Sequence, residues 1–265
     1  MIKSLYTAAT GMKAQQSYVD AVSNNLANVN TNGFKRSQPT FQDLLYVTMK
    51  APGIDQAAGV PNPVGIQLGS GVKLSGTTVN FQPGVLEATG RKLDVAITGD
   101  GFFQILLPDG STGYTRDGHF QVDGDGRLVT SAGNPLLPNV QIPQDTLEIG
   151  IAPDGTIKVT TSTSPDTAQT LAQLQLARFV NPAGLMARGQ NYFIPTDASG
   201  QAIVGNPGQK GSGLGQLLQS HLERSNVEVV SELVNLIVAQ RAYEVNSRAI
   251  RASDDMLTQA SSILR

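Results

Sequence analysis

Cysteine and tryptophan are both absent from the 265 residues of this sequence, and aromatic residues make up only 5% of it. Without cysteine the chain has no disulfide, no thiolate metal ligand and no catalytic thiol. Charged residues are also sparse, at 15%, and a formal net charge of −2 leaves no basic surplus. This balance argues against nucleic acid as the main partner. No apolar run approaches the roughly 20 residues that a membrane-spanning helix needs.

The first residues, MIKSL, lack the charged start, apolar core and small-residue cleavage site of a secretory signal. Two interpretations remain: a cytoplasmic protein, or one exported by a route that cleaves no signal. Composition does not choose between them. Glycine (28) and proline (14) are plentiful, which is typical of β-rich proteins with many tight turns.

Sequence motifs for catalysis and cofactor binding are missing as well. The two histidines, His119 and His221, have no second histidine three or four residues away, which excludes an H-E-x-x-H zinc site. There is no G-x-S-x-G elbow, no phosphate loop and no complete dinucleotide fingerprint. The acidic turn at 123–126 fails as an EF-hand because Gln121 and Ala132 would occupy ligand positions. We therefore predict no metal, no cofactor and no small-molecule substrate.

Two carboxylate pairs, Asp100 with Asp109 and Asp94 with Glu87, have the composition that glycoside cleavage requires. They support one competing hypothesis, a secreted carbohydrate hydrolase with a helical oligomerisation tail. That hypothesis predicts activity against peptidoglycan that is lost on Asp94→Asn. Acidic residues at turns are the norm, however, so we interpret both pairs as structural and predict no enzymatic activity.

Both ends of the chain carry apolar residues in a seven-residue repeat. In each repeat one position is always apolar and its companion position is mostly polar. The apolar position holds Leu5, Met12, Val19 and Leu26 near the N-terminus, and Val229, Leu236, Tyr243, Ile250, Leu257 and Leu264 near the C-terminus. Such a repeat makes a narrow seam for another helix rather than a broad face for a globular core. We predict terminal helices over residues 4 to about 28 and 225–265.

Local signals mark the inner ends of both helices. The first stretch ends in NVNTNG at 28–33, where asparagine and glycine readily take the left-handed conformation that ends helices. The second begins with Ser225 and Glu228, which have the spacing of a capping box.

The burial available to these helices is small. About one residue in seven is securely buried, at roughly 1.5–3 kcal/mol for each large side chain. Ordering each residue costs about 1–2 kcal/mol. A lone pair of helices is therefore marginal, and many copies packed side by side would add burial. An ordinary helical hairpin that caps a globular domain is the alternative, and the pattern alone leaves both open.

The middle of the chain has the pattern of a β protein. From about residue 72 to 203, short apolar runs alternate with Asp-Gly turns, as at 108–110, 123–126 and 153–155. This alternation predicts hairpins and an antiparallel sandwich or barrel-like domain. The predicted fold class is therefore α+β, mainly β. We expect a helical domain from 1–33 and 222–265, an irregular connection at 34–81 with an extended insertion near 46–63, and a β-rich domain at 82–221.

Several short motifs, in order along most of the chain, resemble those of the axial proteins of the bacterial flagellum, the rod and hook family. The longest is SNNLANVNTNGFKR at 23–36. The others are QPG at 82–84, LDVAI at 93–97, GFF at 101–103, YTRDG at 114–118, SNVE at 225–228 and QRAYE at 240–244. The chain length, the FQDLLY stretch at 41–46 and the proline-rich extension to residue 63 are most similar to the members that build the distal rod. A proximal rod or hook-family subunit is the alternative.

The resemblance implies a structural subunit of the distal rod that self-assembles into a straight, rigid helical tube. In this family the terminal helices pair as a coiled coil inside the tube, and the β domain lies outside. The tube transmits motor torque to the hook and provides the export channel, from the periplasm to the outer membrane. The flagellar type III apparatus exports subunits without a cleaved signal. The implied partners are other copies, proximal rod proteins, hook protein, P-ring and L-ring bushing proteins, and the rod-cap muramidase. We interpret the insertion, with Tyr46, Met49, Pro52, Pro61 and Pro63, as the feature that stiffens the rod.

Overall fold

A computed structural model of the protein describes residues 2–51, 64–162, 164–209 and 211–263. They form two compact units. The helical unit consists of Met1–Ala27, Ser37–Thr78 and Glu228–Arg265, and the β unit consists of Asn28–Arg36 and Val79–Val227. The predicted fold class is confirmed: two terminal helices pack together, and the middle of the chain is mostly antiparallel β. No sheet within the described part of the chain closes into a barrel.

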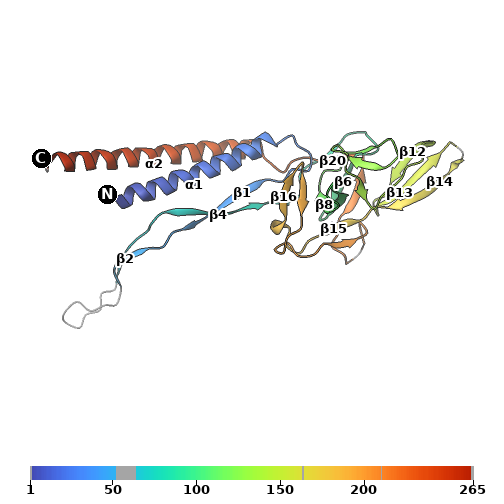
Figure 1. The fold of residues 1–265 in the computed structure, drawn as a ribbon. Helices are drawn as coiled ribbons and strands as arrows, with labels where there is room; N and C mark the ends of the chain where they lie inside the picture. The colour runs from blue at the N-terminus through green and yellow to red at the C-terminus, as the bar shows by residue number, and fades with distance from the viewer. Residues whose placement is uncertain (1, 52–63, 163, 210, 264–265) are drawn as a thin grey trace. The chain divides into compact units, whose positions relative to one another are not determined.

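The helical unit is built on two antiparallel helices, α1 (Ile2–Ala27) and α2 (Val229–Ile263), which run side by side in Figure 1. The hydroxyl oxygens of Ser4 and Ser253 lie 3.4 Å apart, so the start of α1 meets the last third of α2. At 35 residues against 26, α2 is the longer helix. Neither described helix is long and apolar enough to cross a bilayer.

The inner end of α2 differs from the prediction. The helix begins at Val229, four residues after Ser225. The Ser225 hydroxyl accepts a hydrogen bond from the Val227 amide at 3.3 Å, so the predicted capping box does not form. The adjacent Asn226 side chain donates to the carbonyls of Asn80 and Gln82, which keeps this segment out of the helix.

Two strand pairs complete the helical unit. Strand β1 (Ser37–Asp43) pairs with β4 (Val72–Val79), and β2 (Val47–Lys50) pairs with β3 (Ile66–Leu68). The buried Asn25 side chain of α1 binds the first residue of β1 twice: Nδ2 donates to the Ser37 carbonyl at 2.8 Å, and Oδ1 accepts from the Ser37 amide at 2.9 Å. Thr10 Oγ1 accepts from the Val72 amide at 3.3 Å, which also fastens β4 to α1.

The largest sheet of the β unit has seven strands. Its order is β16 (Met186–Gly189), β17 (Tyr192–Ile194), β8 (Thr112–Thr115), β7 (Phe102–Leu106), β15 (Leu176–Arg178) and β18 (Ile203–Gly205), with β11 (Leu136–Leu137) also paired to β7. A one-turn 3₁₀ helix, Pro182–Gly184, precedes β16.

The other strands of the β unit form one three-stranded sheet and three pairs. The three-stranded sheet is β12 (Thr146–Ile151), β13 (Thr156–Thr161) and β14 (Ser164–Gln173). The pairs are β5 (Leu86–Ala88) with β20 (His221–Glu223), β6 (Val95–Thr98) with β19 (Gln216–Gln219), and β9 (Phe120–Val122) with β10 (Leu128–Thr130).

Three predicted Asp-Gly turns are confirmed as the turns of antiparallel hairpins: β7–β8, β9–β10 and β12–β13. Their glycines, Gly110, Gly126 and Gly155, have φ angles of +80°, +81° and +84°, which side-chain-bearing residues rarely adopt. After the β13–β14 turn the chain forms two strands, β14 and β15, instead of one continuous strand. Buried Leu174 lies between them, and its amide donates to the Gly155 carbonyl at 2.8 Å, one residue beyond the Thr156–Gln173 pair of the β13–β14 ladder.

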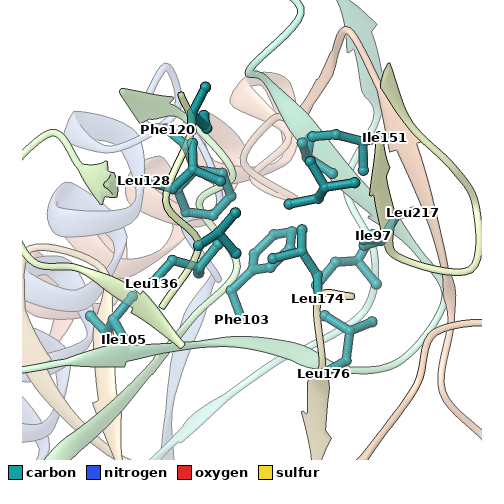
Figure 2. Packing of buried hydrophobic residues seen from close by; sticks show 14 of the residues in the cluster. Ile97, Phe103, Ile105, Phe120, Leu128, Leu136, Ile151, Leu174, Leu176 and Leu217 are labelled. Atoms are coloured by element: carbon teal, nitrogen blue, oxygen red, sulfur yellow. The ribbon is translucent and has the colours of Figure 1, made fainter. Parts of the chain in front are cut away.

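Two apolar clusters form the core of the β unit, and β7 contributes to both. Alternate side chains of a strand point to opposite faces, so Phe103 and Ile105 enter one cluster while Phe102 enters the other. Figure 2 shows the larger cluster, in which the rings of Phe103 and Phe120 meet edge to face with centroids 5.0 Å apart.

We predict that Phe103→Ala lowers the free energy of unfolding by about 3–5 kcal/mol, because it leaves a cavity in this core. Leu106→Ala, on the same strand but 38% exposed, is the control and should change it by less than about 1 kcal/mol. Urea denaturation measures both. Equal losses in the two variants would contradict this description of the core.

Candidate functional site

Seven of the predicted seam residues are half-buried. Along α1 and α2 these half-buried residues are Leu5, Met12, Val19, Leu26, Leu236, Ile250 and Leu257. Two others, Val229 and Tyr243, are at least 40% exposed, and Leu264 lies outside the described residues. Val19 and Tyr243 nevertheless line one groove of about 480 Å³ together with Gln16, Gln240 and Glu244.

The closest part of the helix interface is made by small and polar residues. Ala14 and Ala239 are buried, and the hydroxyls of Ser4 and Ser253 face each other. A Cβ atom placed on Gly11 would lie 3.0 Å from the Asn246 amide nitrogen, so this glycine lets the helices approach. Small groups at these positions therefore let α1 and α2 approach closely.

A second apolar row on α2 faces solvent, and sequence analysis did not identify it. We name it the outer stripe: Val230, Val234, Ile237, Val238 and Val245, each more than half exposed. Their spacing of three, four or seven residues puts them on one side of the helix. The signal lies in the doubled apolar positions 229–230, 233–234 and 237–238, which make a face broader than a single seam. Contiguous exposed apolar side chains of this kind mark an interaction surface.

The β2–β3 segment is the other apolar surface of the helical unit. Tyr46 and Met49 are exposed at 55% and 70%, and the neighbouring Leu45 is exposed at 90%. Val64 and Ile66, on the returning side, are also more than half exposed. Pro52, Pro61 and Pro63 lie outside the described residues.

In the β unit, a buried ionic cluster joins several of the motifs found in the sequence. Lys35, from the 23–36 motif, places Nζ 2.5 Å from Glu223 Oε1, just before the 225–228 motif. The Gly84 amide donates to the same oxygen at 2.9 Å. Arg116, from the 114–118 motif, lies with Nη1 3.5 Å from Glu223 Oε2. All three charged side chains are at most 2% exposed.

Motif glycines allow these segments to touch. A Cβ atom on Gly33 would lie 2.6 Å from the Asp117 amide nitrogen, and the φ angle of Gly33 is +68°. A Cβ atom on Gly118 would lie 1.7 Å from the Val95 carbonyl oxygen. Three of the motifs therefore meet backbone to backbone, which explains the need for glycine at these two positions.

Burial sets the electrostatics of this region. It lowers the pKa of Lys35, and the attraction of Glu223 acts in the opposite direction. The pKa of Asp117 is raised, chiefly because burial disfavours its charged form. Asp117 Oδ1 also accepts from the His119 amide at 3.0 Å, which favours the carboxylate but does not cancel the burial.

In each pair weighed for glycoside cleavage, one carboxylate is held by neighbouring groups of the fold. Asp94 is buried and bound by Thr89 Oγ1 at 2.6 Å and His119 Nδ1 at 3.1 Å. Asp109 binds the Ser111 amide and hydroxyl at the β7–β8 turn, as well as Arg188. No group of three or more metal-ligating side chains occurs among the described residues.

Comparison with known proteins decides among the hypotheses. Residues 5–35 match the family described as flagella basal body rod protein, and residues 218–263 match the flagellar basal body rod FlgEFG protein C-terminal family. Residues 96–159 match the flagellar hook protein FlgE/F/G D1 domain. The flagellar basal-body rod protein FlgG of Borreliella burgdorferi is 46% identical over 267 residues, covering 100% of both chains. FlgG of Caulobacter vibrioides is 46% identical and FlgG of Bacillus subtilis 37% identical, again over 100% of both chains.

The chain belongs to the FlgG family of flagellar basal-body rod proteins. The resemblance to the rod and hook family, and within it to the distal rod protein, is confirmed. This rod protein is a structural subunit of the flagellar basal body and not an enzyme. It is located in the basal-body rod and assembles with other basal-body components.

We predict that Glu223→Gln in this rod protein lowers the free energy of unfolding by about 3–5 kcal/mol, because it leaves two buried cations without their anion. The matched control is Glu87→Gln on the paired strand β5. Its carboxylate is 57% exposed and lies 3.4 Å from Arg224, so the loss should stay below about 1 kcal/mol. Urea denaturation of both variants measures the free energy of unfolding. A loss below about 1 kcal/mol for Glu223→Gln would show that the stability of the fold does not depend on the cluster.

The raised pKa of Asp117 predicts a pH-dependent effect of Asp117→Asn. The folded state holds a proton on Asp117 more tightly than the unfolded state, so this carboxyl disfavours folding once it ionises. The variant should therefore melt at a higher temperature than the wild type at pH 7. The difference should shrink as the pH falls towards the ordinary pKa of aspartate, about 3.9.

Asp109→Asn is the control, and its melting temperature should shift in the opposite direction. Hydrogen bonds from Ser111 and Arg188 lower the pKa of Asp109, so its ionised form stabilises the fold at pH 7 and that contribution is lost as the pH falls. This variant should melt below the wild type at pH 7. A shift of the same sign in both variants would contradict the assignment.

Proposed function

We propose that this chain builds the distal part of the rod by polymerising into a straight, rigid helical tube that transmits motor torque to the hook and encloses the export channel. The observation that carries the proposal is the outer stripe of α2 in a protein of the FlgG family. Each large apolar side chain that becomes buried contributes roughly 1.5–3 kcal/mol. A stripe of five such residues is a strong drive for association.

The arrangement of the stripe favours contacts between different faces of neighbouring copies. The two sides of the helix pair are unlike, since α2 carries the outer stripe while α1 packs against β1 in addition to α2. A contact between unlike surfaces does not close on itself after two copies, and repeated copies then form a ring or a helical filament. Copies that cover the stripe also add the burial that an isolated helix pair lacks.

The predicted seam residues take two roles in this proposal. Leu5, Met12, Val19, Leu26, Leu236, Ile250 and Leu257 hold α1 against α2, and Val229 and Tyr243 contact neighbouring copies together with the outer stripe. Leu264, beyond the described residues, extends the same repeat. In this proposal the helical unit lines the tube and the β unit lies outside.

The insertion at about 46–63 supplies the rigidity in this proposal. Its described part presents Tyr46 and Met49 to solvent, and apolar side chains at such exposure are suited to contact a neighbouring copy. Additional contacts between subunits resist bending of the tube.

Further partners follow from the position of a distal rod. They are the proximal rod proteins below it, the hook protein above it, the P-ring and L-ring bushing proteins around it, and the rod-cap muramidase at its growing end. We propose that the type III export apparatus secretes the chain without cleavage of a signal. The rod then extends from the periplasm to the outer membrane.

We predict that the double variant Val234→Ser with Ile237→Ser polymerises at least about tenfold more slowly than the wild type on isolated rod stubs, because it removes two exposed anchors of the outer stripe. Its thermal unfolding as a monomer should be unchanged, since both side chains are already more than half exposed. Electron microscopy of seeded filaments measures growth.

The matched control is Ile203→Ser with Val204→Ser on β18, where the same two residue types are each 45% exposed in the β unit. This variant should polymerise like the wild type. Equal growth of both double variants would overturn the role of the outer stripe.

A further inference from the structure

A cavity of about 230 Å³ lies in the β unit beside the ionic cluster. Its charged lining consists of Asp100, Arg116 and Arg178. Aromatic rings form much of the remaining wall, from Phe81, Phe102 and Phe179. The two guanidinium groups in this cavity repel each other, so an anion bound between them would lower their electrostatic energy.

Arg116 is the buried part of this site. Only 2% of its side chain is exposed, and neither Nε nor Nη1 has a hydrogen-bond partner. Its nearest interactions are Glu223 Oε2, 3.5 Å from Nη1, and the Phe102 ring, whose centroid is 5.3 Å from Cζ. Unsatisfied buried donors of a charged group are rare because they are costly.

Arg178 contributes a second guanidinium with a buried Nε that has no hydrogen-bond partner. Gly213 makes room for it, since a Cβ atom there would lie 2.4 Å from Arg178 Nη1. Arg178 is half-buried, so it can be replaced with less risk to folding than Arg116.

The charges in and around the cavity leave one positive charge without a partner. Lys35, Arg116 and Arg178 carry three positive charges, whereas Glu223 and Asp100 carry two negative charges. Glu223 Oε1 is already engaged by Lys35 and the Gly84 amide. Asp100 attracts Arg116 but forms no ion pair with either arginine in the described part of the chain.

We propose that this cavity binds a single carboxylate group, with Arg116 and Arg178 as its donors. The single negative charge of a carboxylate equals the unpaired positive charge, and a guanidinium donates to carboxylate oxygens in a planar geometry. The phenylalanine walls receive the apolar part of the same ligand. A phosphate, with more negative charge, would be repelled by Asp100 more strongly than a carboxylate is, and would exceed the single unpaired positive charge. The carboxylate belongs either to an acidic side chain of a neighbouring copy or to a free small molecule.

The first experiment uses the full chain as a monomer and follows the Nε–H signals of Arg116 and Arg178 by NMR. Sodium phenylacetate and sodium acetate are titrated, with sodium chloride and sodium phosphate at matched ionic strength. We expect saturable shifts with both carboxylates, and tighter binding of phenylacetate because its ring contacts the phenylalanines.

Arg178→Gln should weaken phenylacetate binding at least about tenfold, because one charged hydrogen bond is lost. Arg178→Lys, which keeps the charge but not the planar donors, should fall between this variant and the wild type. The control Arg248→Gln removes an exposed arginine of α2 in the helical unit and should bind like the wild type. Absence of saturable shifts, equal shifts with phosphate, or unchanged binding by Arg178→Gln would overturn the proposal.

The second experiment identifies the source of the carboxylate by seeded polymerisation, and it rests on the proposed function. Slow growth of Arg178→Gln, together with inhibition of wild-type growth by phenylacetate, assigns the carboxylate to a neighbouring copy. Normal growth of a variant that has lost phenylacetate binding assigns it to a free molecule. If the wild type itself does not polymerise, the proposed function fails while the NMR result still decides the cavity.

Discussion

The fold depends most on one buried carboxylate, that of Glu223, which is shared by Lys35, Arg116 and the Gly84 amide. Water is excluded from the group, so the cost of burying the charges is offset only if all partners stay in place. Glu223 and its three partners come from four stretches of the chain, including the segment after α1 (Lys35) and the segment before α2 (Glu223). The cluster therefore holds the entry and exit of the β unit together, and it explains why motifs nearly 200 residues apart along the chain belong to one structural element.

The helical unit differs from the β unit, because many of its large apolar side chains are exposed. Its interface contains Ala14, Ala239, the Ser4–Ser253 contact and Gly11, whereas large aliphatic residues such as Val234 and Ile237 remain outside. Close approach of small groups aligns two helices but buries little apolar area. The exposed apolar side chains remain available for contacts with other molecules, as expected of a rod subunit that assembles with other basal-body components. The β unit is therefore stabilised by its own core, whereas the helix pair leaves apolar side chains exposed for assembly.

Local chemistry accounts for the parts of the structure that the sequence predicts well. The Asp-Gly turns at 108–110, 123–126 and 153–155 form hairpins because glycine there takes a positive φ that other residues resist. The heptads of apolar residues produce two helices. The capping box at Ser225 fails for a non-local reason, since Asn226 binds the carbonyls of Asn80 and Gln82. The sequence did not predict strands β19 and β20. Strand β19 pairs with β6 and β20 pairs with β5, and each pair joins segments more than a hundred residues apart.

The sequence by itself determined the antiparallel β character of the middle, the two terminal helices, the absence of thiol chemistry and the family. These properties depend on periodicity, turn residues and motifs, all of which are local or ordered along the chain. Only the tertiary structure decided which apolar row of α2 stays exposed, that Lys35, Arg116 and Glu223 form one cluster, and that Arg116 and Arg178 share a cavity. A residue type states which interactions a side chain is able to make, but the partner it meets and the water it loses depend on how distant segments pack.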